Sequence, residues 1–188
     1  CIDPDAQIPL EFYGRYGYYA EVNPELADVQ RPAFVRVPTG NTEMFPEFYR
    51  QMETRLEKAV ARIEEAAVLM DDAHRVGFDS EASMERWFYH IARTEANFYD
   101  AFLLRQSLGG MVKQVEQGTP LTEDQRDNAR VRVQRLREIL ADELENAREA
   151  LPVMESDMRL DFAYMGFCPG AKMIRKKMEL LQAEIDQY

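Results

Sequence analysis

The sequence predicts an all-α fold: an antiparallel bundle of three long helices plus a shorter C-terminal helix, preceded by a coil-rich N-terminal arm. Apolar residues recur at spacings of three and four from about residue 42 onward, as one face of a helix requires. Residues that start or break helices divide this pattern into four segments. With 188 residues, of which 46% are apolar, the chain suits one helical bundle domain over 42–188 after an arm over 1–41.

The arm has no helical period and holds five prolines, which favour extended or turn structure. It also carries an aromatic cluster, made of Phe12, Tyr13, Tyr16, Tyr18 and Tyr19. We expect this cluster to lie on the helical body or on a partner. Because aromatic rings also stack on the apolar faces of sugars, a glycan is an alternative occupant.

Four helices are predicted in order. The first runs from Thr42, whose hydroxyl can cap its first turn, to about Met70. A break through residues 74–78 precedes the second, which is capped by Asp79 or Ser80 and is aromatic enough to be central. Within the second helix the Gly109-Gly110 pair favours a kink or a close helix contact.

The third helix has the clearest start, because Thr122 and Gln125 have the spacing of a capping box, and it is predicted to end before Pro152. The fourth follows Pro169, a residue suited to a first helical position. Short connections between long helices predict antiparallel packing.

Charge limits the classes of partner. The chain has 34 acidic and 23 Lys or Arg residues, a net charge of -11, which repels phosphate backbones and argues against nucleic-acid binding. No apolar run is long enough for a membrane-spanning helix. The last helix nevertheless carries a basic run that includes Lys172, Arg175 and Lys176. We expect it to contact an acidic partner or anionic head groups, unless neighbouring carboxylates simply neutralise it.

The two cysteines bear on location. Cys1, as the first residue, fits a bacterial lipoprotein that is lipidated after signal cleavage, and the alternative is that a fragment merely starts there. Cys168 is either a buried thiol or a disulfide partner of Cys1. The lipoprotein interpretation predicts a periplasmic or cell-surface location with membrane anchoring through Cys1.

Candidate chemistry is sparse. A di-iron bundle needs two Glu-x-x-His repeats, and the chain has only two histidines, so no metal or other cofactor is expected. His90 and Glu95 form a candidate acid–base pair, against the alternative of a histidine hydrogen-bonded in the core. Asp157 and Arg159 suggest a structural latch after the third helix, against the alternative of a ligand-binding arginine.

Three segments carry a family resemblance: Phe88 to Leu104, Leu151 to Leu160 and Met173 to Leu181. Together they resemble the C-terminal helical region of large exported bacterial glycosidase-like proteins related to hexosaminidases and α-glucuronidases. The resemblance implies a helical module outside the cytoplasm that is attached to carbohydrate processing. The resemblance assigns no catalytic residue to this chain. The paired carboxylates of that family belong to a barrel, and a barrel needs on the order of 200 residues by itself.

From these observations we predict a non-catalytic extracytoplasmic helical protein, an accessory or assembly subunit of a larger complex with a protein partner. One alternative is a carbohydrate-associated module in which Tyr16, Tyr18 and Tyr19 contact sugar. The other is a small helical enzyme that uses His90 and Glu95.

Overall fold

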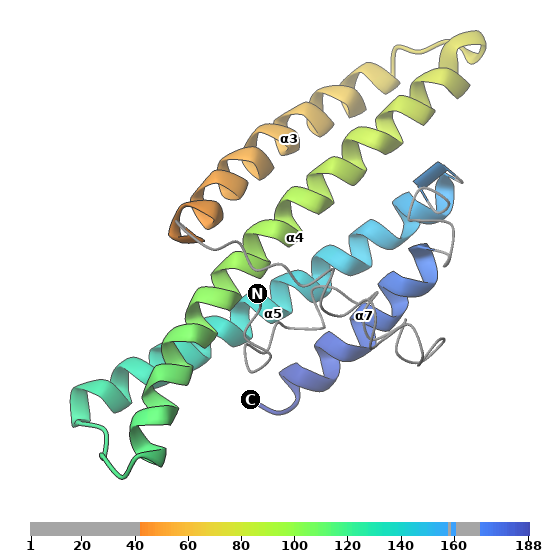
Figure 1. The fold of residues 1–188 in the computed structure, drawn as a ribbon. Helices are drawn as coiled ribbons and strands as arrows, with labels where there is room; N and C mark the ends of the chain where they lie inside the picture. The colour runs from red at the N-terminus through yellow and green to blue at the C-terminus, as the bar shows by residue number, and fades with distance from the viewer. Residues whose placement is uncertain (1–41, 158, 161–169) are drawn as a thin grey trace.

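The computed structural model describes residues 42–157, 159–160 and 170–188 (Figure 1). Within these ranges a short 3-10 turn is followed by helices only, and no strand occurs. The elements are η1 (Thr42–Met44), α3 (Phe45–Ala67), α4 (Asp72–Glu116), α5 (Glu123–Ser156) and α7 (Gly170–Ile185). The predicted fold class, three long helices and a shorter C-terminal one, is therefore confirmed.

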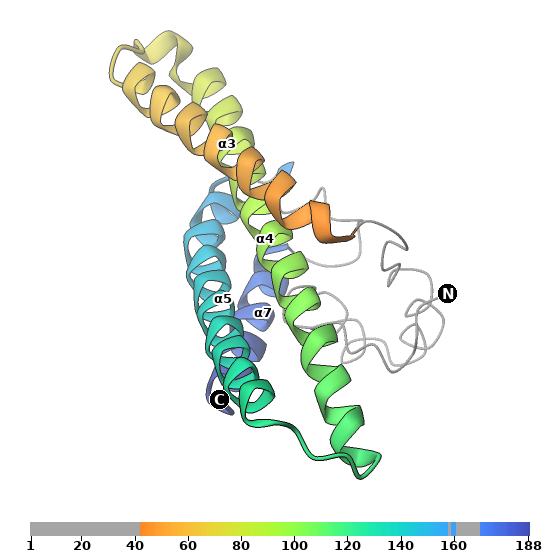
Figure 2. The same cartoon turned by 90° about the vertical axis from the view of Figure 1, so that its left-hand side faces the viewer.

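The helices pack in the order of the chain. α3 lies antiparallel on α4, α4 packs on α5, and α5 packs on α7 (Figures 1 and 2). In the described part of the chain α3 has no comparable packing on α5 or α7. The α3–α4 hairpin therefore extends past the other two helices, and its closed end projects from the body in both views.

The first helix differs from its prediction at both ends. The 3-10 turn occupies Thr42–Met44, so the N-cap of α3 is Met44, which makes no side-chain capping bond. Pro46 lies in the first turn, where its missing N–H has no helical partner to lose. α3 ends at Ala67 rather than Met70, because Val68–Met70 form the turn into α4.

The predicted break at residues 74–78 is wrong. α4 already begins at Asp72, and Asp71 caps it by accepting a hydrogen bond from the backbone N–H of His74 at 3.0 Å. Gly77 remains inside the helix, since one glycine costs only about 1 kcal/mol relative to alanine. A Cβ at Gly109 or Gly110 would meet no atom of the described residues within 4 Å, so no close contact with another described helix requires these glycines, and the alternative of a kink stays a prediction.

The start of α5 confirms its prediction. The Thr122 hydroxyl accepts from the Gln125 N–H at 3.2 Å, and the Gln125 side chain accepts from the Thr122 N–H at 2.9 Å. The predicted end is wrong, because α5 passes through Pro152 to Ser156. Burial of Met154 explains the continuation: this side chain is almost fully enclosed, among residues of α5 and α7.

We expect replacing Thr122 by alanine to lower the free energy of unfolding by about 1 kcal/mol, because it removes the acceptor that satisfies the first turn of α5. Urea denaturation followed by circular dichroism measures the loss. Thr119→Ala, in the same exposed loop but without a side-chain bond among the described residues, is the matched control and should leave the midpoint unchanged. Equal effects of the two substitutions would contradict the capping role.

The core lies between α4, α5 and α7, in two clusters. The members of the larger one are Phe98, Tyr99, Ala101, Leu136, Ile139, Leu140, Leu144 and Leu181. The smaller one contains Ala147, Ala150, Met154, Leu160, Ala171 and Ile174. α3 contributes no buried residue to either. It is fixed at its N-terminal end instead, where Phe45 and Tyr49 stack on Tyr99 with ring centroids 4.8 and 5.7 Å apart.

Candidate functional site

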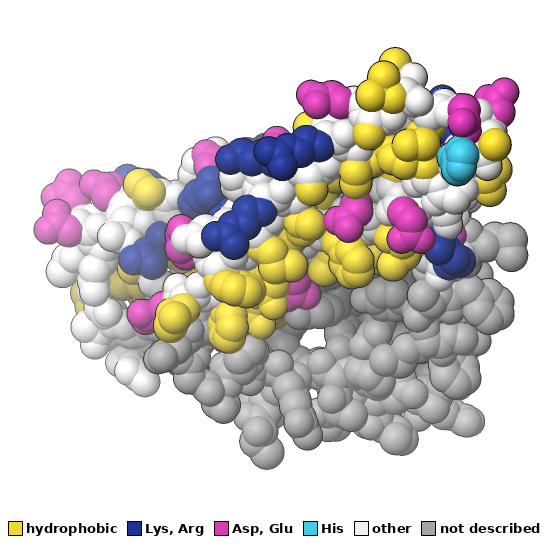
Figure 3. Space-filling view, turned by 90° about the horizontal axis from the view of Figure 1, so that it is seen from above, with side chains coloured by type: hydrophobic (Ala, Val, Ile, Leu, Met, Phe, Trp, Pro, Cys, Tyr) yellow, Lys and Arg dark blue, Asp and Glu magenta, His cyan; other side chains and the backbone are white. Residues whose placement is uncertain are grey.

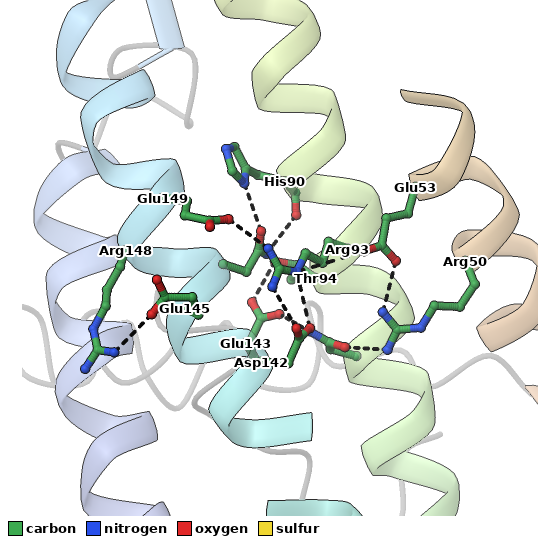
Figure 4. A network of polar contacts seen from close by, with 12 residues as sticks. Arg50, Glu53, His90, Arg93, Thr94, Asp142, Glu143, Glu145, Arg148 and Glu149 are labelled. Carbon is green, nitrogen blue, oxygen red and sulfur yellow. Dashed lines mark hydrogen bonds and ion pairs between the residues drawn. The ribbon is translucent and has the colours of Figure 1, made fainter. Parts of the chain in front are cut away.

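The most prominent cluster of ionisable side chains is a polar network that joins α3, α4 and α5 (Figure 4), and the ion pair of Lys177 with Glu143 adds α7 to it. Its central members are Arg50 of α3, His90, Arg93, Thr94 and Asn97 of α4, Asp142, Glu143 and Asn146 of α5, and Lys177 of α7. Asn97, Glu143 and Asn146 are at most 1% exposed, so the centre of the network is part of the interior, while Arg50 and Asp142 reach the surface. We call it the interhelical network.

Glu143 is the centre of this network. Its carboxylate accepts from the Thr94 hydroxyl at 2.7 Å and from Asn97 Nδ2 at 2.8 Å. Lys177 forms an ion pair with it from α7 and also reaches Thr94 Oγ1 at 3.3 Å. A buried charge is tolerated when it is paired and its remaining acceptor sites are hydrogen-bonded, and Glu143 meets both conditions.

A second ion pair borders the first. Arg93 donates to Asp142 through Nη2 at 2.7 Å and Nε at 3.2 Å, a bidentate arrangement, and to Glu149 through Nη1 at 2.8 Å. Burial by itself raises the pKa of Asp142, but the hydrogen bonds from Arg93 and Asn97 outweigh burial and hold that pKa below its ordinary value. Asp142 is therefore ionised at neutral pH.

Arg50 brings α3 into the network. Its Nη2 donates to Asn97 Oδ1 at 2.5 Å and to Asp100 at 3.2 Å, while Nη1 pairs with Glu53 at 2.9 Å. Since Asn97 also donates to Asp142 at 2.7 Å and to Glu143, one amide links α3, α4 and α5. These contacts fix the N-terminal half of α3, the half that lies far from the hairpin tip.

His90 is a core histidine. Asn146 donates its Nδ2 hydrogens to the His90 carbonyl at 3.1 Å and to Thr94 at 2.9 Å, so its Oδ1 must face the ring. His90 Nδ1 lies 2.8 Å from that oxygen and therefore carries the proton. Burial lowers the pKa of His90, so the ring is neutral at neutral pH. This is the hydrogen-bonded core histidine that the sequence offered as the alternative to a catalytic one.

Glu95, the other half of the proposed acid–base pair, faces different neighbours. Burial raises its pKa, Lys177 opposes that rise and Glu143 adds to it. Burial and the nearby Glu95 carboxylate also raise the pKa of Tyr99 to about 12. Among the described residues no hydrogen bond or ion pair joins His90 to Glu95. The structure therefore does not bring the two side chains together as an acid–base pair would require, and the enzyme alternative stays a prediction.

We expect acidification to destabilise the fold through His90. Because its folded pKa lies below the ordinary 6.5, the unfolded chain takes up a proton that the folded chain does not, once the pH falls through 6.5. The free energy of unfolding should then fall by up to about 1.4 kcal/mol per pH unit in that window. The groups that face the ring are Asn146, Glu149, Glu143 and Arg93.

Chemical denaturation of the wild type and of His90→Gln between pH 7.5 and 5 measures this contribution. The slope of the wild type should exceed that of the variant. A slope that His90→Gln leaves unchanged would contradict the buried neutral ring.

The interhelical network is saturated. In the described residues no buried side-chain nitrogen or oxygen lacks a hydrogen-bond partner, so none is left over to point at a ligand. The described ranges also contain no group of three or more His, Cys, Asp or Glu side chains that could hold a metal ion. Such an arrangement fixes how the helices meet, and the hydrogen-bonding capacity of its fully buried side-chain atoms in the described residues is used within the protein.

The latch residues do meet. Asp157 Oδ1 accepts from the Arg159 N–H at 2.9 Å, and Asp157 Oδ2 accepts from Arg159 Nη2 at 2.8 Å. Arg159 Nη2 also donates to the Ser80 carbonyl on α4 at 2.6 Å. The hydrogen bonds from Arg159 hold the pKa of Asp157 below its ordinary value. This geometry ties the end of α5 to α4, as a latch must.

The basic run of α7 has neighbouring carboxylates. Arg175 pairs with Glu155 of α5, Lys176 lies 3.4 Å from Glu179, and Lys172 is exposed. Contact of this run with a partner stays a prediction.

The aromatic cluster of the arm (Phe12, Tyr13, Tyr16, Tyr18 and Tyr19), Cys1 and Cys168 lie outside the described residues.

Sequence reasoning missed most of the network. The signal available was a set of polar residues at helical spacing within otherwise apolar stripes: Arg93, Asn97 and Asp100 on α4, and Asp142, Asn146 and Glu149 on α5. Such residues look like a solvated face when each helix is considered separately. Only the juxtaposition of α4 and α5 shows that they face each other.

Comparison of the chain with protein-family models, with curated proteins and with solved structures finds no match. The resemblance to the C-terminal helical region of exported glycosidase-like proteins therefore stays a prediction. No helix in the described ranges is both long enough and apolar enough to cross a bilayer.

Proposed function

We propose that this protein is a non-catalytic assembly subunit that binds a protein partner through the projecting end of its α3–α4 hairpin. The observation that carries the proposal is the exposure of three apolar side chains at this end. Val68, Leu69 and Val76 are 82%, 85% and 81% exposed, although they lie within nine residues of one another. We call residues 64–81 the hairpin tip.

The construction of the hairpin supports the proposal. α3 has a continuous apolar stripe yet buries no residue, because among the described helices only α4 packs extensively on it. Large apolar side chains that cluster on a protruding element are typical of interaction sites, whereas singly scattered ones are not. The saturated interhelical network holds the base of the hairpin, so the tip is presented from a fixed support.

Cross-linking in the native cells tests the proposal. A photo-reactive residue at Leu69 should give discrete cross-linked products, and one at Val131, which is 70% exposed on α5, should not. Val68→Ser/Leu69→Ser/Val76→Ser should abolish these products while changing the free energy of unfolding by no more than about 0.5 kcal/mol per site, because the side chains touch little in the folded chain. Equal cross-linking from both positions would exclude the tip as the binding element.

The location outside the cytoplasm, the lipid on Cys1 and the carbohydrate-associated alternative remain predictions from the sequence, because Cys1 and the arm tyrosines lie outside the described residues.

A further inference from the structure

An exposed face of α3 carries a row of three cations. Arg55, Lys58 and Arg62 follow one another at spacings of three and four, so they share this face, and all three are exposed. None forms an ion pair with another described residue. A shallow groove beside Arg55 and Lys58 is also lined by Glu47, Arg50, Gln51 and Thr54. We call the three cations the basic row.

The hairpin tip has the opposite charge. Residues 64–81 contain six carboxylates and one arginine, a formal net charge of -5, and all six carboxylates are exposed. Among them Glu65, Asp72 and Asp79 have no ion-pair partner within the described ranges. Figure 3 shows this division of the surface: Lys and Arg side chains gather along the middle of the hairpin, while hydrophobic and acidic side chains gather toward its end.

The two features are placed for mutual contact between copies. Residues 55 and 69 are about 20 Å apart along the hairpin, by the 1.5 Å rise per residue of a helix. Two hairpins lying antiparallel across a twofold axis bring the tip of each beside the basic row of the other. Such an interface uses the same surface on both copies and closes after two chains.

We propose that the partner of the hairpin is a second copy of this chain, in an antiparallel dimer in which each acidic, apolar tip lies on the basic row of the other copy. The inference rests on the proposed function, since it names the partner of the same tip. The arginine and lysine stems provide apolar surface for Val68 and Leu69, and their charged ends meet the tip carboxylates. The negative charge of the tip also disfavours an anionic membrane as the binding partner of the hairpin.

A charge swap tests the dimer. One variant reverses the row (Arg55→Glu/Lys58→Glu/Arg62→Glu) and a second reverses the tip (Glu65→Lys/Asp72→Lys/Asp79→Lys). In sedimentation equilibrium at about 50 mM salt, where exposed charges are weakly screened, the wild type should be dimeric and each variant monomeric. An equimolar mixture of the two should recover a dimer that contains one copy of each, because both contacts are then attractive.

A matched reversal elsewhere is the control. Lys113→Glu/Arg126→Glu/Arg137→Glu changes the net charge by the same amount at exposed cations that have no ion-pair partner in the described ranges, and it should remain dimeric. Circular dichroism of every variant checks that it folds.

A monomeric wild type, a control that dissociates or a mixture that stays monomeric would each overturn the dimer. A monomeric wild type whose Leu69 still cross-links to a different protein would leave the proposed function standing. If Leu69 gave no cross-linked product that Val131 did not also give, the proposed function would be wrong as well.

Discussion

Replacing Lys177 by methionine is expected to lower the free energy of unfolding by about 3–5 kcal/mol, because it leaves the Glu143 carboxylate buried without a cation. Glu143 is 0% exposed, and its other partners, Thr94 and Asn97, are neutral. Methionine keeps most of the length and apolar character of the lysine stem, so little packing is lost.

A double-mutant cycle separates the charge from the packing. Adding Glu143→Gln to Lys177→Met removes the orphaned charge while keeping an oxygen that can accept from Thr94, so it should recover most of the lost stability. Urea denaturation of the wild type, both single variants and the double variant measures the coupling. Lys113→Met, at an exposed site on α4, is the control and should have almost no effect. Additive losses in the cycle would contradict a coupled buried pair.

Replacing Leu140 by alanine should lower the free energy of unfolding by about 3–4 kcal/mol, because Leu140 is fully buried in the larger core cluster and leaves a cavity there. The same substitution at Leu56, which is only partly buried on α3, should cost less, about 1–2 kcal/mol, since part of its apolar surface already faces water in the folded chain. Chemical denaturation compares the two.

Native-state hydrogen exchange provides a second measurement of this contrast. The outer half of α3 has no buried residue and should exchange through local opening, whereas amides around Leu140 should require global unfolding. Equal losses from the two leucine substitutions, or equal protection of the two regions, would show that the hairpin is as firmly packed as the core.

The helix boundaries show which local signals in the sequence are sufficient to predict where a helix begins or ends. The capping box at Thr122 needs only residues three apart, and it predicted the start of α5. The start of α4 differs from its prediction, because Gly77 does not break the helix, and Asp71 and Asp72 supply a cap and a favourable first-turn charge. Pro152 does not end α5 as predicted, because burial of Met154 in the tertiary structure favours the longer helix.

The stripe of α3 shows the limit of periodicity. It was the most regular stripe in the sequence, yet the core formed on α4, α5 and α7, and α3 contributed nothing fully buried to it. Periodicity tells which side chains share a face, and it cannot tell which element covers that face. The exposure of Val68 and Leu69 at the hairpin tip could not be predicted from local spacing.

The sequence by itself determined that the described part of the chain forms three long helices and a shorter one, and where the best-capped one begins, because these features depend on neighbours within one or two turns. Only the tertiary structure decided that Glu143, Asn97 and Lys177 meet in the interior, and that His90 is held by Asn146 rather than paired with Glu95. Those contacts join residues on different helices, and the free energy of burying a polar group depends on the partner that it finds there.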